Sequence, residues 1–259
     1  MKARFYLRLF TVFISFFVLA ESTHATTTET VNTMLPEHAS FFDQEEFTVI
    51  TKYESKKGYR KKFRKALRTY VKLANTDPDN VMAEAFHEQE NPNIFWVIER
   101  WENKIALENL SRNGKLKLLR FLSEKKLVQP VKPIYARDLE PISKSDWQRT
   151  SAQEDTPMVI MLFVDSKAGT AQRFKEVYHT AMPQFRSEPG VINYQLSQLE
   201  ADSTQFVTYE KFRSEAAFQY HLNFPPIQPV IDYLNTSIKK QPFQTGLHRL
   251  IEFAPKKRK

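Results

Sequence analysis

The chain has 259 residues, 41% of them hydrophobic and 26% charged, a composition that fits about two globular domains and excludes a wholly disordered chain. It contains no cysteine, which excludes disulfides, thiolate metal sites and cysteine nucleophiles. Its five glycines are widely separated, so the chain has neither a phosphate-binding loop nor a dinucleotide-binding fingerprint. Lys and Arg number 38 against 30 Asp and Glu, a formal net charge of +8.

The first 25 residues have the three-part pattern of a secretory signal peptide. Three basic residues precede an apolar run over 9–20, and small residues follow up to Ala25. The run is shorter than the roughly 20 residues of a membrane-spanning helix, so an uncleaved anchor is the lesser alternative. We expect cleavage after Ala25, with Ala20 as second choice, and export to the periplasm or the medium. Residues 26–45 lack periodicity and are expected to be a disordered lead-in.

From residue 46 onward the chain contains the same unit twice, at an offset of 111 residues. The sequence at 55–58 aligns with 166–169, and several later positions also align: Phe63 with Phe174, Pro78 with Pro189, Phe95 with Phe206 and Glu99 with Glu210. We therefore expect two similar domains, a linker between them and a short tail. The expected boundaries are 46–142 for the first domain, 143–156 for a linker, 157–254 for the second domain and 255–259 for a basic tail.

Each copy has the pattern order strand, helix, strand, strand, helix, strand. Strands are predicted over 47–53, 81–88, 94–101 and 134–139, and over 158–164, 191–198, 205–212 and 247–253. Helical spacing of apolar residues falls between, over 59–74 and 106–110 in the first copy and over 174–185 and 217–221 in the second. This βαββαβ order is the ferredoxin-like arrangement, of class α+β.

The first strand of the second copy, 158–164, is apolar at every position. Both of its faces should therefore be buried. Ferredoxin-like helices cover only one face of their sheet. The other copy is the expected cover for the second face. We therefore predict two tandem ferredoxin-like domains packed sheet to sheet, as a dimeric α/β barrel within one chain.

Three segments of the second copy resemble the antibiotic biosynthesis monooxygenase family. They are Ser187-Glu188-Pro189-Gly190-Val191-Ile192-Asn193-Tyr194, then Tyr209-Glu210-Lys211-Phe212, then Glu215-Ala216-Ala217-Phe218 with His221. The resemblance covers most of 157–254 and, more faintly, 46–142. It implies oxidation of a small electron-rich aromatic, such as a quinol or phenol, by O2 without metal or flavin. It also leaves an alternative, because many members have no demonstrated activity: a non-catalytic, envelope-associated ligand-binding or interaction module.

His221 is the predicted catalytic residue. A bound quinol must lose a proton before it passes an electron to oxygen, so the site needs a base in an apolar pocket. His221 lies on the inward stripe of its helix, one turn from Ala217 and Phe218, and its counterpart in the first copy is Leu110. The alternative is a core histidine with a hydrogen-bond partner. The first copy lacks the histidine and is expected to be scaffold.

The predicted substrate-binding residues lie on two neighbouring strands of the second copy: Asn193, Tyr194, Tyr209, Glu210 and Phe212. Asn193 and Tyr194 point to opposite faces of one strand, so at most one of them reaches the helix-side pocket. Glu210 and its counterpart Glu99 each share a strand face with an aromatic residue two positions later. Such a carboxylate either has a raised pKa or forms an ion pair with Lys or Arg.

Eight Lys or Arg residues crowd the predicted helical region 56–68, on the side away from its apolar stripe. No aromatic residues alternate with them on the exposed side, so we expect no nucleic-acid partner. Contact with an anionic envelope surface is one interpretation and a solvated helix face is the other. The histidines lack the close spacing of zinc ligands, so we expect no metal.

Overall fold

The computed structural model describes residues 46–149, 151–152 and 154–254, which belong to one compact unit. The predicted signal peptide, the lead-in over 26–45 and the basic tail lie outside the described residues. The first half contains β1 (Phe47–Glu54), α1 (Arg60–Ala74), β2 (Asn80–Glu88), β3 (Ile94–Trp101), α2 (Lys104–Ser111), η2 (Gly114–Leu116), α3 (Lys117–Lys125) and β4 (Ile134–Leu139). After α4 (Lys144–Trp147), the second half contains β5 (Met158–Asp165), α5 (Ala171–Ser187), β6 (Val191–Leu199), β7 (Gln205–Phe212), α6 (Glu215–Leu222), η3 (Pro225–Ile227), α7 (Gln228–Thr236), η4 (Phe243–Gly246) and β8 (Leu247–Ala254).

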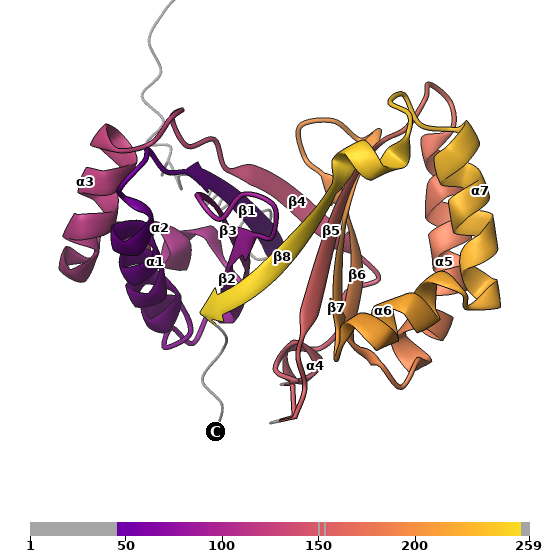
Figure 1. Cartoon of the computed structure of the whole chain (residues 1–259), viewed down its shortest axis with the longest axis horizontal. Coiled ribbons are helices and arrows are strands. Elements are labelled where there is room, and N and C mark those ends of the chain that lie inside the picture. The colour runs from indigo at the N-terminus through magenta and orange to yellow at the C-terminus, as the bar shows by residue number, and fades with distance from the viewer. Residues whose placement is uncertain (1–45, 150, 153, 255–259) are drawn as a thin grey trace, which may run out of the picture. The chain divides into compact units, whose positions relative to one another are not determined.

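The strands form a closed antiparallel barrel in the order β1-β3-β2-β8-β5-β7-β6-β4. The last strand of each half connects the halves, because β4 pairs with both β1 and β6, and β8 pairs with both β5 and β2. In Figure 1, β8 runs from the second half to the first. The predicted α+β barrel of two tandem ferredoxin-like units within one chain is therefore confirmed.

The duplication is visible in the element boundaries. β1 begins at Phe47 and β5 at Met158, and the same 111-residue offset separates α1 from α5, β2 from β6, β3 from β7 and α3 from α7. A glycine with positive φ precedes the first helix of each half, Gly58 at 88° and Gly169 at 78°. Residues with a side chain rarely adopt a positive φ, so the turn into each helix favours glycine.

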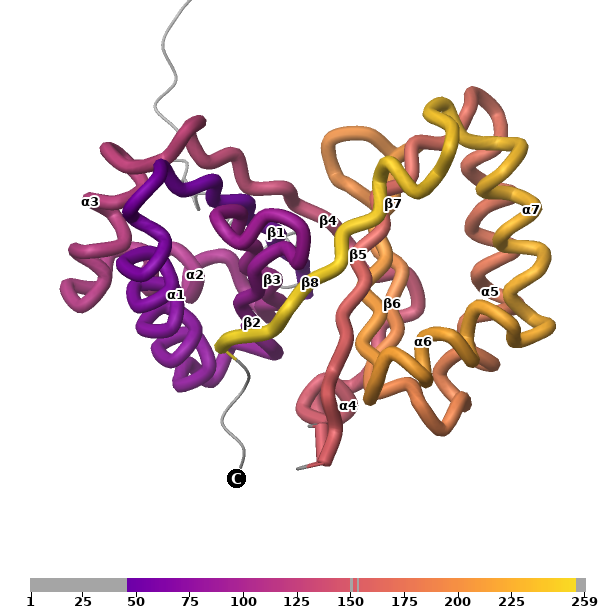
Figure 2. Tube along the Cα trace, viewed as in Figure 1, coloured from indigo at the N-terminus to yellow at the C-terminus, as the bar shows by residue number. Residues whose placement is uncertain are grey.

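Three apolar clusters hold the molecule together, which explains why the first strands are apolar on both faces. One lies between the first-half helices and their strands, and a second is its equivalent in the other half. The third fills the barrel interior. Val49 on β1 belongs to the helix side and its neighbour Ile50 to the interior. Figure 2 shows α1 to α3 and α5 to α7 on the outside of the strands.

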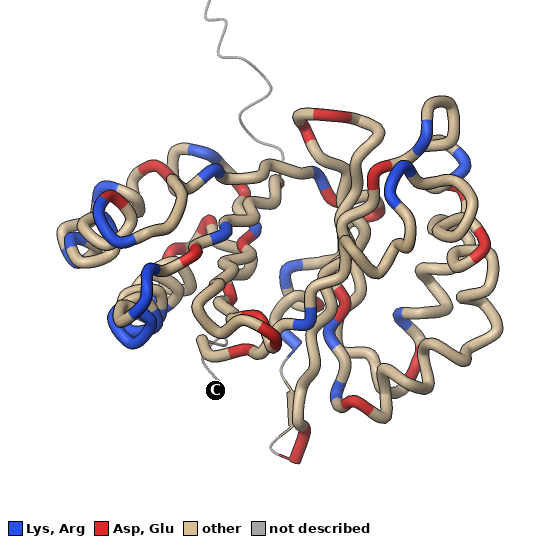
Figure 3. Tube along the Cα trace, turned by 45° about the horizontal axis from the view of Figure 1, so that its top comes forward, with Lys and Arg blue, Asp and Glu red and all other residues tan. Residues whose placement is uncertain are grey.

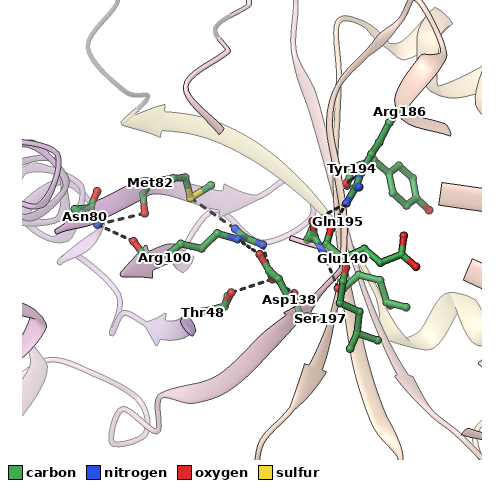
Figure 4. Close-up of polar contacts among 12 residues, drawn as sticks. Thr48, Asn80, Met82, Arg100, Asp138, Glu140, Arg186, Tyr194, Gln195 and Ser197 are labelled. Atoms are coloured by element: carbon green, nitrogen blue, oxygen red, sulfur yellow. Dashed lines mark hydrogen bonds and ion pairs between the residues drawn. The ribbon is translucent and has the colours of Figure 1, made fainter. Parts of the chain in front are cut away.

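The barrel interior also contains a buried polar network around an ion pair, and the network includes strands of both halves (Figure 4). Arg100 Nε on β3 donates to Asp138 Oδ2 on β4 at 2.6 Å, and both side chains are buried. The hydroxyls of Thr48 and Ser197 donate to Asp138 Oδ1 at 3.0 and 2.5 Å. Asp138 therefore has a donor from β1, β3 and the second-half strand β6.

Three local features differ from the sequence predictions. The second helical pattern of each half continues through a 3₁₀ turn into a further helix, α3 or α7, and Pro229 is accommodated in the first turn of α7, where its missing N–H costs nothing. The predicted linker over 143–156 contains α4, whose Trp147 is buried in the interior cluster. Lys56 and Lys57 precede α1, which begins only at Arg60, so the basic region 56–68 is not one helix.

Candidate functional site

Each half has a space between its helices and its sheet, with a buried glutamate at the same place. Glu99 lies on β3 and Glu210 on β7, both facing the helices. The residue opposite each glutamate on the neighbouring strand differs: Ala83 pairs with Glu99, whereas Tyr194 pairs with Glu210. This exchange of a methyl group for a phenol ring makes the two spaces unequal.

The first-half space is a pocket of about 320 Å³. Glu99 on β3 and three tyrosines form its inner wall. The tyrosines are Tyr53 on β1, Tyr70 on α1 and Tyr135 on β4. Apolar side chains of the helices, among them Leu107, Leu116 and Leu119, form the opposite wall. Lys104, Glu108 and Arg120 also line the pocket, so charged groups stand beside an otherwise apolar and aromatic space.

Glu99 is a buried carboxyl group with a raised pKa. It is 3% exposed, and burial raises its pKa from 4.5 to about 7, although the donors Trp101 and Tyr70 oppose the shift. Tyr70 donates to both carboxylate oxygens, at 3.0 and 2.9 Å, and Trp101 Nε1 donates to Oε2 at 2.8 Å. Burial and the charge of Glu99 raise the pKa of Tyr70, so its hydroxyl keeps its proton and remains a donor.

The second-half space is nearly filled. Its cavity measures about 40 Å³, with Tyr194, Glu210 and His221 among the lining residues. Glu210 accepts hydrogen bonds from Tyr194 OH at 3.2 Å and Thr208 Oγ1 at 2.7 Å, and burial raises its pKa. A volume of 40 Å³ holds about one water molecule and no aromatic ring.

His221 is buried in this filled space. Its Nδ1 lies 2.7 Å from Glu188 Oε1, and the ring packs against Phe185, Tyr194 and Phe212 at centroid distances of 4.7, 5.4 and 5.2 Å. The partner expected for a buried histidine is therefore Glu188. The catalytic role of His221 stays a prediction, and the space beside it has no room for a quinol in this conformation.

The comparisons with known proteins agree with this architecture. A family model described as antibiotic biosynthesis monooxygenase matches residues 46–117 and 157–231, together more than half of the chain. The chain belongs to the antibiotic biosynthesis monooxygenase family. Its two matched segments correspond to the two halves of the barrel, so this family member contains two tandem copies of the domain.

Solved structures share the whole double barrel. A candidate monooxygenase from Lactobacillus acidophilus superposes with a TM-score of 0.66 at 15% identity, covering 82% of this chain and 97% of that one. A second, from Fusobacterium nucleatum, gives 0.67 at 13% identity over 80% and 92%. An anthrone oxidase-like protein gives 0.54 at 9% identity over 81% and 92%. At these identities the likeness concerns the fold.

A relative in sequence is an uncharacterized protein of Synechocystis sp., 28% identical over 88 residues. The match covers 34% of this chain and 55% of that protein. This family member therefore spans little more than half the length of that relative.

The predicted substrate-binding residues divide between two faces of the sheet. Tyr194, Glu210 and Phe212 face the helices together with His221. Asn193 and Tyr209 face the barrel interior instead, so they share no pocket with His221. Asn193 Nδ2 donates to the carbonyl of Asp146, and Tyr209 OH donates to Glu84 Oε2 at 2.5 Å. Alternation along the strands separates the two sets.

Of the two alternatives for the paired glutamates, the structure favours the raised pKa. Among the described side chains, neither Glu99 nor Glu210 forms an ion pair with Lys or Arg; phenol, indole and hydroxyl groups bind them instead. The sequence offered one sign that the first copy holds the larger space, the small Ala83 where the second copy has Tyr194. Within the described ranges, no three His, Asp or Glu side chains are grouped as a metal site.

Proposed function

We propose that this family member oxidises a small phenol- or quinol-like aromatic with O2 and that the reaction takes place in the first half, beside Glu99. One observation carries the proposal: a buried carboxyl group with a pKa of about 7 stands in a 320 Å³ pocket lined by tyrosines. A general base is most effective when its pKa lies near the working pH. The volume is within the range of small-molecule sites.

The pocket residues have separate roles in this proposal. Glu99 Oε1 accepts only the Tyr70 hydroxyl among the described donors, so it retains capacity to accept the hydroxyl proton of a substrate. Tyr70 and Trp101 hold the carboxylate in place and stabilise its charge. The rings of Tyr53 and Tyr135 provide apolar faces for an aromatic substrate.

The chemistry balances with O2 as the sole oxidant. Glu99 takes the phenolic proton, and the electron-rich phenolate passes one electron to O2. Recombination of the two radicals forms a carbon–oxygen bond at a ring C–H position. Loss of water then breaks the O–O bond: one oxygen atom remains as the new carbonyl of a quinone, and the other leaves as water with the two hydrogens lost by the substrate.

Solved structures with this fold support an oxygenase, and the N-terminal sequence supports action outside the cytoplasm. The structures that share the double barrel include proteins described as candidate monooxygenases and one described as anthrone oxidase-like. The signal-peptide pattern of the first 25 residues supports a site of action outside the cytoplasm, where the protein would meet its substrate after export.

The test uses the internal duplication as its control. Glu99→Gln should lower oxygen uptake with a responsive phenol or quinol by about 10²–10⁴-fold, the contribution typical of a positioned general base. Glu210→Gln changes the equivalent residue in the filled half and should leave uptake within about threefold. Equal loss in both variants, or loss in Glu210→Gln alone, would contradict the first-half site. Absence of uptake by the wild type across a broad substrate panel would favour the non-catalytic binding module.

A further inference from the structure

The outward face of α1 is far more basic than its packing requires. The helix has seven Lys or Arg and no Asp or Glu among 15 residues. Its buried stripe is entirely separate: Phe63, Ala66, Leu67, Tyr70, Val71 and Ala74. Arg64 and Arg68 lie over the Phe253 ring, whereas Lys61 and Lys65 are exposed and form no salt bridge with an acidic residue of the described chain. Figure 3 shows Lys and Arg concentrated on the helices at the left.

The neighbouring helix α3 adds exposed apolar side chains to this basic surface. α3 packs beside α1, and Leu118 and Phe121 on it are 41% and 52% exposed. Lys117 and Lys125 lie on the same short helix and are also exposed. Exposed rings among lysines are typical of surfaces that lie on a bilayer, where the cations meet headgroups and the apolar groups enter the boundary below them.

The second half shows that the fold does not require this surface. At the 111-residue offset, Lys65 corresponds to Glu176 and Phe121 to Asp232, and both of these residues are exposed. Yet α5 and α7 pack on their sheet as α1 and α3 do, through buried apolar stripes. The basic and apolar character of the first half is therefore a property of its surface alone.

We propose that the outward faces of α1 and α3 dock on an anionic lipid bilayer. Lysines of α1 contact the headgroups, and Phe121 and Leu118 insert among them. No helix of the described chain is long and apolar enough to cross a membrane. A nucleic acid would pair with the basic side chains but would leave the exposed Phe121 and Leu118 in water. Nucleic-acid binding is the competing outcome of the test.

The position of the surface also bears on the substrate. Leu116, Leu119 and Arg120, which line the pocket beside Glu99, come from η2 and α3, so docking places the pocket wall next to the bilayer. If the proposed function holds, this location favours a phenol or quinol dissolved in the membrane. The docking itself does not depend on catalysis and is measured without substrate.

The first experiment places a fluorophore on the surface. The chain has three tryptophans, Trp96, Trp101 and Trp147, and all are buried. The emission of an added tryptophan in Phe121→Trp should shift to the blue with vesicles of phosphatidylglycerol and phosphatidylcholine. It should not shift with phosphatidylcholine alone. No shift and no co-sedimentation with the anionic vesicles at low salt would overturn the proposal.

The second experiment separates the bilayer from other polyanions. Lys61→Glu with Lys65→Glu should lower the partition coefficient on anionic vesicles by at least about tenfold. Arg173→Glu with Lys175→Glu makes the same charge change on α5 and should alter it less than about twofold, with thermal melts confirming that both variants fold. Phe121→Ser, which leaves the charge unchanged, should weaken vesicle binding but not binding to duplex DNA. Strong DNA binding together with vesicle binding that is insensitive to Phe121→Ser would assign the surface to nucleic acid.

Discussion

Glu99 and Glu210 occupy the same strand position, face the same way and are both buried. Their surroundings differ at the opposing residue, Ala83 or Tyr194, and at the helix position that carries Leu110 or His221. The pocket volume falls from about 320 to about 40 Å³ between them. A duplicated carboxyl group therefore borders an open pocket in one half and is enclosed by packed side chains in the other.

The raised pKa of Glu99 predicts a pH dependence of both activity and stability. Because the base must be ionised, kcat/KM should rise with pH through about 7. The folded pKa lies above the unfolded value of 4.5, so the protonated carboxyl group favours the native state and stability falls as pH rises from 4.5 to about 7. The loss amounts to about 3 kcal/mol. Denaturant titrations at pH 5 and 8 should detect it, and Glu99→Gln should abolish this part of the slope.

The pair of His221 and Glu188 predicts a loss of stability that a second substitution reverses. His221→Leu, which copies the first half, leaves the buried carboxylate of Glu188 without its partner and should cost about 3 kcal/mol of unfolding free energy. Adding Glu188→Gln should restore a large part of the lost unfolding free energy. Chemical denaturation of the single and the double variant measures both changes. If the recovered double variant has lost oxygen uptake, His221 and not Glu99 is the base.

At the scale of elements, the two halves are joined by β4 and β8, each of which pairs with strands of both halves. Two buried polar groups join the halves across this junction: the Arg100–Asp138 pair of the first half accepts a hydrogen bond from Ser197 on β6, and Lys211 on β7 pairs with Glu84 on β2 at 2.8 Å. α4 packs on the same region, where the Arg100 guanidinium carbon lies 3.7 Å from the centre of the Trp147 ring. The segment between the halves therefore contributes one side chain, Trp147, to the barrel core.

Asp138→Ala should destabilise the barrel by about 3–5 kcal/mol, because the buried Arg100 guanidinium loses its counter-ion. A matched control is Glu102→Ala, which removes a half-exposed salt bridge to Lys144 and should cost less than about 1 kcal/mol. Urea denaturation at constant pH distinguishes the two. Equal small losses would show that the interior pair contributes little to the junction.

At the scale of the whole molecule, fusion of the two copies in one chain permits the asymmetry. In a symmetric homodimer every substitution appears in both pockets. In a tandem barrel one half can fill its pocket with Tyr194 and His221 while the other keeps its pocket open, and one outer surface can become basic while the other stays mixed. The duplication within one chain therefore allows the two halves to differ.

Export makes a prediction about the chain as produced in a cell. If the signal-peptide interpretation is right, N-terminal sequencing of the protein from an envelope or secreted fraction should begin at Thr26. A start at Glu21 would move the cleavage site to Ala20. Recovery of intact Met1 from soluble cytoplasm would contradict export altogether.

The sequence by itself determined the architecture. Apolar runs at the strand positions locate every strand of the described chain to within one residue at each end, and the 111-residue repeat with the doubly apolar 158–164 segment predicts a sheet-to-sheet barrel. These signals depend on residues that are close in the sequence or repeat along it, so they can be identified from the sequence alone. The extra helices α3 and α7 were missed because short turns interrupt the helical period.

Only the tertiary structure decided which half has a pocket and which residues share it. The sequence marks His221 because a titratable residue stands where the first copy has Leu110, but it does not show Glu188, 33 residues away, at its Nδ1. Strand alternation predicts that Asn193 and Tyr194 face opposite sides, and only the structure shows that Asn193 and Tyr209 face the barrel interior. Free volume depends on which side chains meet across three or four elements, and no single stretch of sequence contains that information.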